Sequence, residues 1–133
     1  MKCAYLVFAI AYSAVAAAWP QAAQAMQGTT DASAGISLST VIAVSTINPI
    51  FEEIFVCGYV MTALKDRRDP WTGINVSVAI RLLYHLYLGA ISAIGIVPFG
   101  LIFGFWYART GRLWPVIVAH AVWDFASLMQ FVR

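Results

Sequence analysis

Most charged residues of this chain stand in short clusters, and the stretches between the clusters are apolar and long enough to cross a membrane. An α-helix rises about 1.5 Å per residue and must cover a hydrocarbon core of about 30 Å, so about 20 residues make one crossing. Residues 42–64 fit one crossing, and residues 113–132 fit another. Residues 70–108 would form about 58 Å of helix, which fits two crossings joined by a turn. The pattern therefore predicts a bundle of transmembrane helices.

The composition supports a membrane protein. Hydrophobic residues make up 62% of the 133 residues and charged residues 11%, and the mean hydropathy of +0.79 is too high for an ordinary soluble domain. Basic residues mark cytoplasmic loops, which places residues 65–69 and 109–112 on the cytoplasmic side. Residues 92–98, which contain Gly95 and Pro98, supply the turn between the two crossings. We therefore expect an all-α, polytopic integral protein of the bacterial inner (cytoplasmic) membrane.

The N-terminal part, residues 1–40, is expected to differ from the core at residues 41–133. Lys2 and the apolar run after it are typical of a first membrane span, which brings the total to about five spans. The same features, with small residues at 23–25, also resemble a secretory signal peptide, and its cleavage would leave four spans. In both cases residues 21–40 form a flexible extracytoplasmic connector.

Several classes of protein are excluded by what the sequence lacks. Its two cysteines, Cys3 and Cys57, both lie in apolar segments, so neither a disulfide framework nor a thiolate metal site is indicated. There is no Gly-rich phosphate loop and no long basic tract, so nucleic acid is not an expected partner. The lipid bilayer is the expected surrounding, and the sequence indicates no oligomeric state.

Six ionisable residues nevertheless fall inside the predicted spans. A charged side chain at the bilayer centre costs roughly 2.5 to 3.5 kcal/mol even on lenient scales, so such residues mark functional sites by default. From the helical rise, Glu53 and His85 lie about 18 to 20 Å from the cytoplasmic ends of their helices. His120 lies about 12 Å and Asp124 about 18 Å from the corresponding end. We expect Glu53, His85, His120 and Asp124, together with the adjacent Glu52, to meet in one layer. The sixth residue, Arg81, lies four residues before His85 and so shares a helix face with it.

The order of these residues resembles the CPBP family of intramembrane proteases, also called the Abi family, which includes CAAX-processing and bacteriocin-processing enzymes. The likeness covers roughly residues 45–130 and rests on three short motifs of that family. Residues 52–57 correspond to Glu-Glu-x-x-x-Arg, residues 81–85 to Phe-x-x-x-His, and residues 120–124 to His-x-x-x-Asn or His-x-x-x-Asp. Each motif alone is weak, but their joint occurrence in order on separate spans is specific.

Two positions depart from the family pattern. Cys57 stands where the family has Arg, and Arg81 stands where it has Phe. An unpaired charge is costly inside a membrane protein, and Glu53 has lost the partner it would have had four residues along its own helix. We therefore predict that Arg81 supplies the missing charge from the neighbouring span and pairs with Glu53.

The resemblance implies an intramembrane endopeptidase that acts on a hydrophobic or lipidated peptide or protein. It assigns Glu52, beside the second acid Glu53, and His85 to activation of the attacking water. It assigns His120 and Asp124 to the side of the oxyanion. In a second scheme Glu52, His85 and His120 hold a metal ion such as Zn²⁺, whose bound water attacks. Spacing leaves both schemes open, and nothing in the sequence identifies the substrate.

Two alternatives without proteolysis also fit parts of the pattern. A membrane immunity or accessory protein would keep the fold and bind a peptide without cutting it, and the Cys57 substitution favours this alternative. A haem-binding bundle would use His85 and His120 as axial ligands. The adjacent acids argue against haem, because an apolar haem pocket has no evident need of them.

Overall fold

The computed structural model describes residues 35–65, 69–88 and 93–132, with a few isolated positions between residues 10 and 24. The expected first span or signal segment and most of the expected connector therefore lie outside the described residues. The connector was predicted to reach residue 40, but Leu38, Ser39 and Thr40 already belong to the first described helix, Leu38–Glu53. The described part contains four α-helices, two short 3₁₀ turns and no strand, so the all-α prediction is confirmed there. In chain order the elements are α3 (Leu38–Glu53), the π-helix η1 (Ile54–Met61), α4 (Trp71–Tyr84), η2 (Leu86–Leu88), α5 (Ala93–Thr110), α6 (Trp114–Leu128) and η4 (Met129–Phe131).

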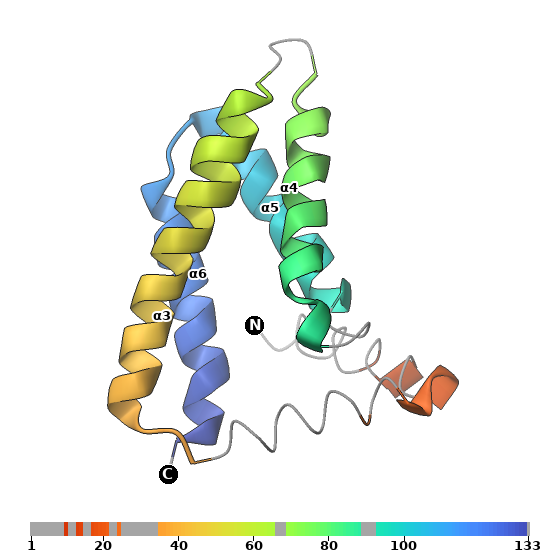
Figure 1. The fold of residues 1–133 in the computed structure, drawn as a ribbon, viewed down its shortest axis with the longest axis vertical. Helices are drawn as coiled ribbons and strands as arrows, with labels where there is room; N and C mark the ends of the chain where they lie inside the picture. Colours follow the sequence, from red (N-terminus) through yellow and green to blue (C-terminus); the bar gives the residue numbers. More distant parts are fainter. Residues whose placement is uncertain are drawn as a thin grey trace.

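The helices form a small bundle around α3 and η1. Helix α3 packs along α6, η1 contacts α4, and α4 packs on α5 (Figure 1). An isolated bridge between Ile36 and Val132 and a hydrogen bond from Gly35 N to the Phe131 carbonyl, at 3.0 Å, join the start of α3 to the end of the chain. The bundle therefore places α3 against α6, and η1, which directly follows α3, against α4.

Helix α3 and η1 form one continuous helix, Leu38–Met61, of 24 residues. It begins at Ser37, whose hydroxyl accepts a hydrogen bond from Thr40 N at 3.2 Å, as an N-cap residue does. Pro49 lies inside α3 and is buried, yet the helix continues through it. The π-helix starts at Ile54, directly after the paired acids. Such segments are rare and frequently lie at functional sites.

Helix α4 is shorter than the sequence predicts. Asp69 starts it by accepting hydrogen bonds from the Thr72 hydroxyl at 2.9 Å and from Trp71 N at 3.0 Å, which lower the pKa of the Asp69 carboxyl. The helix has 14 residues and ends at Tyr84, so it is about 21 Å long. His85 is its C-cap, with φ −99° and ψ 7°.

The predicted turn at residues 92–98 is wrong in position. Residues 93–98 belong to α5, so the chain turns earlier, between Tyr84 and Ala93. Pro98 lies inside α5, where its missing N–H leaves the Ile94 carbonyl without its usual helical donor. Membrane helices tolerate such a proline because neighbouring groups satisfy the freed carbonyl, so Pro98 alone does not end a helix.

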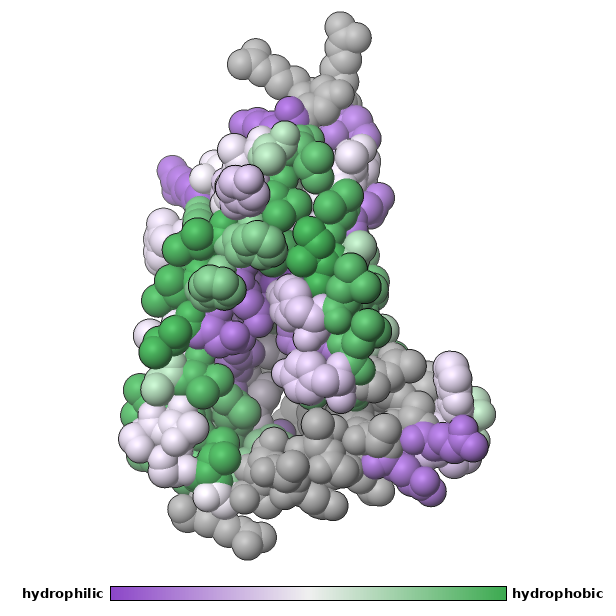
Figure 2. Space-filling model, in the orientation of Figure 1, coloured by the Kyte–Doolittle hydropathy of each residue, from purple (hydrophilic) through white to green (hydrophobic). Residues whose placement is uncertain are grey.

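The outer surfaces of the described helices are strongly apolar. Leu38–Met61 and Ala93–Thr110 are each long and apolar enough to cross a membrane, and only 11% of the most apolar window of α5 is buried in the protein. Hydrophobic surface covers most of both α3 and α4 in Figure 2. Extensive apolar exposure of this kind suits contact with lipid. The count of about five spans stays a prediction.

Glycines let α5 approach α4 closely. A methyl group on Gly100 would lie 3.0 Å from Val78 Cγ2 and 3.2 Å from Arg81 Cδ, both tighter than ordinary contacts. Small residues at helix crossings are typical of packing inside membranes. Gly100 therefore leaves the space that the Arg81 side chain occupies.

We expect Gly100→Ala to lower the thermal unfolding temperature of the purified protein in detergent, because overpacking of this kind costs about 1 to 3 kcal/mol. The matched control is Gly58→Ala, since a methyl group at Gly58 would meet Leu113 Cδ2 at an ordinary 3.4 Å. Gly58→Ala should unfold close to the wild-type temperature. Equal stability of the two variants would contradict the tight crossing of α4 and α5.

Candidate active site

Glu53 is the centre of a buried polar cluster contributed by three helices. Its side chain is fully buried. Arg81 Nη2, from α4, donates to Glu53 Oε2 at 2.5 Å, and His120 Nδ1, from α6, lies 2.7 Å from Oε1. Cys57 Sγ, one turn along the same helix, donates to Oε2 at 3.2 Å. The pairing of Glu53 with Arg81 that the sequence predicts is therefore present.

Glu52 is held by two side chains that do not contact Glu53 in the cluster described above, Asn48 and Tyr84. Asn48 Nδ2 donates to Glu52 Oε1 at 2.8 Å, and the Tyr84 hydroxyl donates to Oε2 at 2.7 Å. Arg81 Nη1 lies 3.7 Å from Glu52 Oε2, so the one guanidinium stands beside both acids. Glu52 keeps 8% of its surface exposed, in contrast to Glu53. The two neighbouring acids therefore differ in both partners and access.

His120 lies between two carboxylates. A carboxylate paired with a guanidinium only accepts hydrogen bonds, so the proton of the 2.7 Å contact to Glu53 belongs to His120 Nδ1. On the other side of the ring, Nε2 lies 3.5 Å from Asp124 Oδ1. Phe99 packs edge-on against the imidazole with ring centroids 4.9 Å apart. Glu53 thus fixes the orientation of His120 and leaves Nε2 toward Asp124.

His85 lies at the end of α4 and not inside a continuing helix. Because α4 ends at Tyr84, His85 follows the helix, and its Nδ1 lies 2.9 Å from the Arg81 carbonyl, one of the groups that a helix end leaves unpaired. Its ring lies 4.6 Å from that of Tyr84, between centroids. Within the described residues, no hydrogen bond or ion pair joins His85 to the acids or to His120. A direct contact of His85 with the acids or with His120 therefore stays a prediction.

Two residues of this region were not predicted from the sequence. Asn48 stands four residues before Glu52, a spacing that places two side chains on one helix face and would have identified it. Tyr84 has no comparable signal, because its contact with Glu52 depends on how α3 and α4 pack. Both are direct partners of Glu52.

The predicted metal ligands do not converge in this structure. Among the described residues no group of three or more His, Cys, Asp or Glu side chains is arranged to hold a metal ion. Both oxygens of Glu52 accept protein hydrogen bonds, and His120 Nδ1 is turned to Glu53. His85 Nδ1 faces a backbone carbonyl. This donor set does not fit Zn²⁺ as it stands, and the metal scheme stays a prediction from the resemblance.

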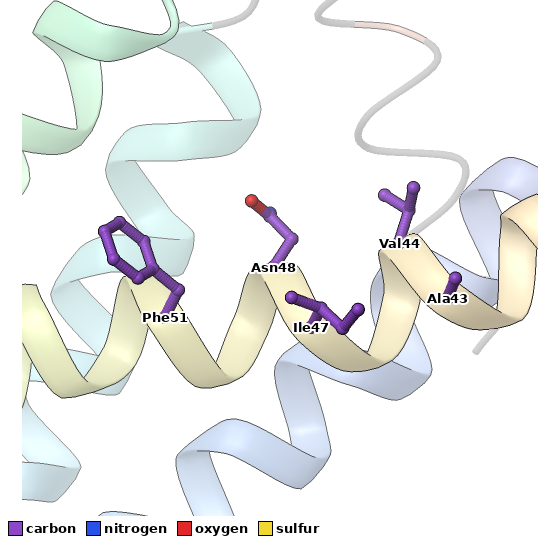
Figure 3. Close-up of a pocket in the computed structure, with 5 residues that line it drawn as sticks. All are labelled: Ala43, Val44, Ile47, Asn48 and Phe51. Atoms are coloured by element: carbon purple, nitrogen blue, oxygen red, sulfur yellow. The ribbon is translucent and has the colours of Figure 1, made fainter.

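The polar groups are surrounded by apolar surface. In Figure 2 hydrophilic atoms lie in a hollow between the hydrophobic surfaces of α3 and α4. A shallow groove of about 410 Å³ follows the outer side of α3 and is lined by Ala43, Val44, Ile47, Asn48 and Phe51 (Figure 3). Asn48 is the one polar residue of that lining. The groove thus reaches a side chain that is bonded to Glu52.

Comparison with known proteins identifies the family. No curated protein and no solved structure matches this chain. A family model described as "Type II CAAX prenyl endopeptidase Rce1-like" matches residues 34–126. The match covers more than half of the 133 residues and runs from the start of α3 to within α6, so it includes both acids, Arg81 and His120. This chain belongs to the Rce1-like family of type II CAAX prenyl endopeptidases.

Proposed function

We propose that this chain is an intramembrane endopeptidase that hydrolyses a peptide bond in a hydrophobic or lipidated peptide, with Glu52 as the general base. Family membership and the apolar helices indicate an integral membrane protease that acts on peptides. We infer that it lies in the bacterial inner membrane, and the basic residues of loops 65–69 and 109–112 support a cytoplasmic position for these two loops. The observation that carries the proposal is a carboxylate that keeps 8% of its surface exposed and lies next to a fully buried Glu53, which pairs with Arg81 and His120.

Glu53 and Glu52 have different roles in this proposal. Glu53 is fully buried and accepts hydrogen bonds on both oxygens, so no water reaches it and it serves to hold Arg81 and His120 in place. A carboxylate has about four lone-pair sites, and the two hydrogen bonds to Glu52 leave about half of them free. Glu52 also keeps some exposed surface. Glu52 is therefore the acid that can accept a proton from water.

His120 is suited to stabilise the oxyanion. The hydrogen bond from Nδ1–H to Glu53 fixes the imidazole in one orientation and leaves Nε2 on the opposite side of the ring. A carboxylate orients the catalytic histidine of a Ser-His-Asp triad in the same way. A protonated Nε2 donates to a developing oxyanion. Asp124, 3.5 Å from Nε2, stabilises the protonated ring. The role of His85 beside Glu52 rests on the family resemblance.

The proposed reaction moves one proton through Glu52. Glu52 takes a proton from a water molecule while the oxygen of that water attacks the carbonyl carbon of the scissile bond. The carbonyl oxygen becomes an oxyanion that accepts a hydrogen bond from His120. When the C–N bond breaks, Glu52 returns the proton to the leaving amine. Arg81 keeps Glu53 charged and buried throughout.

The substitution at Cys57, which favoured a non-proteolytic accessory protein, no longer supports that alternative. Cys57 stands where the family has Arg, but the Arg81 guanidinium occupies the position beside Glu53 Oε2 and lies 3.7 Å from Cys57 Sγ. The charge that the substitution removed is thus supplied from α4.

The experiment that tests the proposal is a cleavage assay with the purified protein in liposomes. Three peptide classes are compared: prenylated C-terminal peptides, the same peptides without the lipid, and hydrophobic leader peptides, with products identified by mass spectrometry. We expect cleavage of at least one class. A parallel series with a chelator and with added Zn²⁺ separates the glutamate scheme from the metal scheme. A folded, inserted protein that cleaves no member of any class would overturn the proposal.

A further inference from the structure

Glu52 is held by two donors that come from different helices and reach different oxygens. Asn48 lies one turn before Glu52 on α3 and projects from that helix between Val44 and Phe51 (Figure 3). Tyr84 is the last residue of α4 and reaches Glu52 across the packing of the two helices. The hydrogen bonds measure 2.8 and 2.7 Å, as expected for donors to a charged acceptor.

Two hydrogen bonds of this kind remove the freedom that a glutamate otherwise has. The terminal torsion of Glu is broad, so a carboxylate held by a single bond can still rotate. One donor on each oxygen fixes the plane of the carboxylate and leaves the remaining lone pairs in fixed directions. A general base requires such a fixed direction, because a misplacement of about 1 Å costs roughly 100-fold in rate.

Tyr84 also links Glu52 to His85. Its hydroxyl binds Glu52, and its ring lies 4.6 Å from the imidazole of His85, between centroids. Tyr84 therefore stands between the two residues that the family resemblance assigns to water activation.

We propose that Asn48 and Tyr84 are positioning residues that lock the Glu52 carboxylate in the orientation needed to activate water. The catalytic part of this inference rests on the function proposed above. The hydrogen-bonded lock itself does not, so the two can be tested separately.

The kinetic test uses Tyr84→Phe and Asn48→Leu, which remove one donor each. We expect each to lower kcat about 10- to 100-fold while KM stays within about twofold, because the effect falls on the reacting group rather than on substrate binding. The fold-decrease in kcat of the double variant should be smaller than the product of the two single fold-decreases, because both residues act through one carboxylate. A thermal unfolding temperature close to wild type accompanies these losses.

Two control variants make the same substitutions at described residues that make no hydrogen bond with Glu52. Tyr59→Phe removes a hydroxyl that makes no hydrogen bond with the described residues, from a side chain that is 69% exposed. Asn75→Leu makes the same substitution as Asn48→Leu at an exposed site of α4. Both should retain wild-type kcat. An unchanged kcat in Tyr84→Phe would overturn the positioning role. So would a lower kcat in a Tyr84→Phe protein whose thermal unfolding temperature shows that it is partly unfolded under the assay conditions.

A second measurement needs no substrate. The infrared C–O band of the Tyr84 phenol, isolated by subtracting the spectrum of Tyr84→Phe, reports the hydrogen bond that the hydroxyl donates. We expect Glu52→Gln to shift this band, because a charged acceptor is replaced by a neutral one. An unshifted band would refute the lock. A shifted band in a protein that cleaves no peptide would refute the proposed function and the positioning role while leaving the lock in place.

Discussion

Arg81→Phe should destabilise the protein by about 3 kcal/mol or more, because removing one partner of a buried ion pair leaves an uncompensated charge. Arg81 and Glu53 are almost completely buried, and their 2.5 Å contact is the shortest of the cluster. His120 and Cys57 would still donate to Glu53, but neither replaces a permanent positive charge. Thermal unfolding in detergent measures the loss directly.

Rescue by Cys57→Arg separates lost charge from lost packing. Cys57 already contacts both partners, with its Sγ 3.2 Å from Glu53 Oε2 and 3.7 Å from Arg81 Nη2. A guanidinium introduced there, together with Phe at position 81, restores the charge beside Glu53 in the arrangement of the family motif. The control variant combines Arg81→Phe with Cys57→Leu, which fills space without charge. Equal stability of the two double variants would show that charge pairing is not what Arg81 contributes.

Glu52→Gln should lower the cleavage rate by about 100-fold or more, since that is the usual contribution of a general base. Gln has almost the shape of Glu, and its carbonyl oxygen can still accept a hydrogen bond from Tyr84 or Asn48. The amide is not basic, so it cannot take a proton from water. The loss should therefore appear in kcat.

The fold should survive this substitution. The ion pair of Glu52 with Arg81 is long, with Arg81 Nη1 3.7 Å from Glu52 Oε2, whereas the short 2.5 Å contact of the guanidinium goes to Glu53. Thermal unfolding near the wild-type temperature, with normal insertion into liposomes, is the control. A variant that lost activity only because it unfolded would leave Glu52 without a demonstrated role in the chemistry.

The charge pairing of the site could be predicted from the sequence because it follows from energetic cost. An isolated charge is costly inside the bundle. Because position 57 has Cys in place of the family's Arg, and position 81 has Arg in place of the family's Phe, the sequence predicted that Arg81 pairs with Glu53. The placement of His120 beside Asp124 followed equally from their spacing of four residues.

Other features depend on tertiary packing and on helix ends. The sequence did not predict that α4 ends at Tyr84, which makes His85 the C-cap of the helix. Helix boundaries are weakly encoded in an apolar segment without a capping signal, and Pro98 pointed to the wrong place for the turn. The π-helix after Glu53 and the contact of Tyr84 with Glu52 have no sequence signature, because each depends on how neighbouring helices meet.

The central claim is that Glu52 activates water for peptide hydrolysis, and isotope incorporation tests it most directly. A peptide that the wild type cleaves is incubated in water enriched in ¹⁸O, with wild type and Glu52→Gln in identical liposomes. We predict that the wild-type product carries ¹⁸O in its new C-terminal carboxylate, and that Glu52→Gln forms almost no product over the same time. Labelled product formed equally fast by Glu52→Gln would contradict the account.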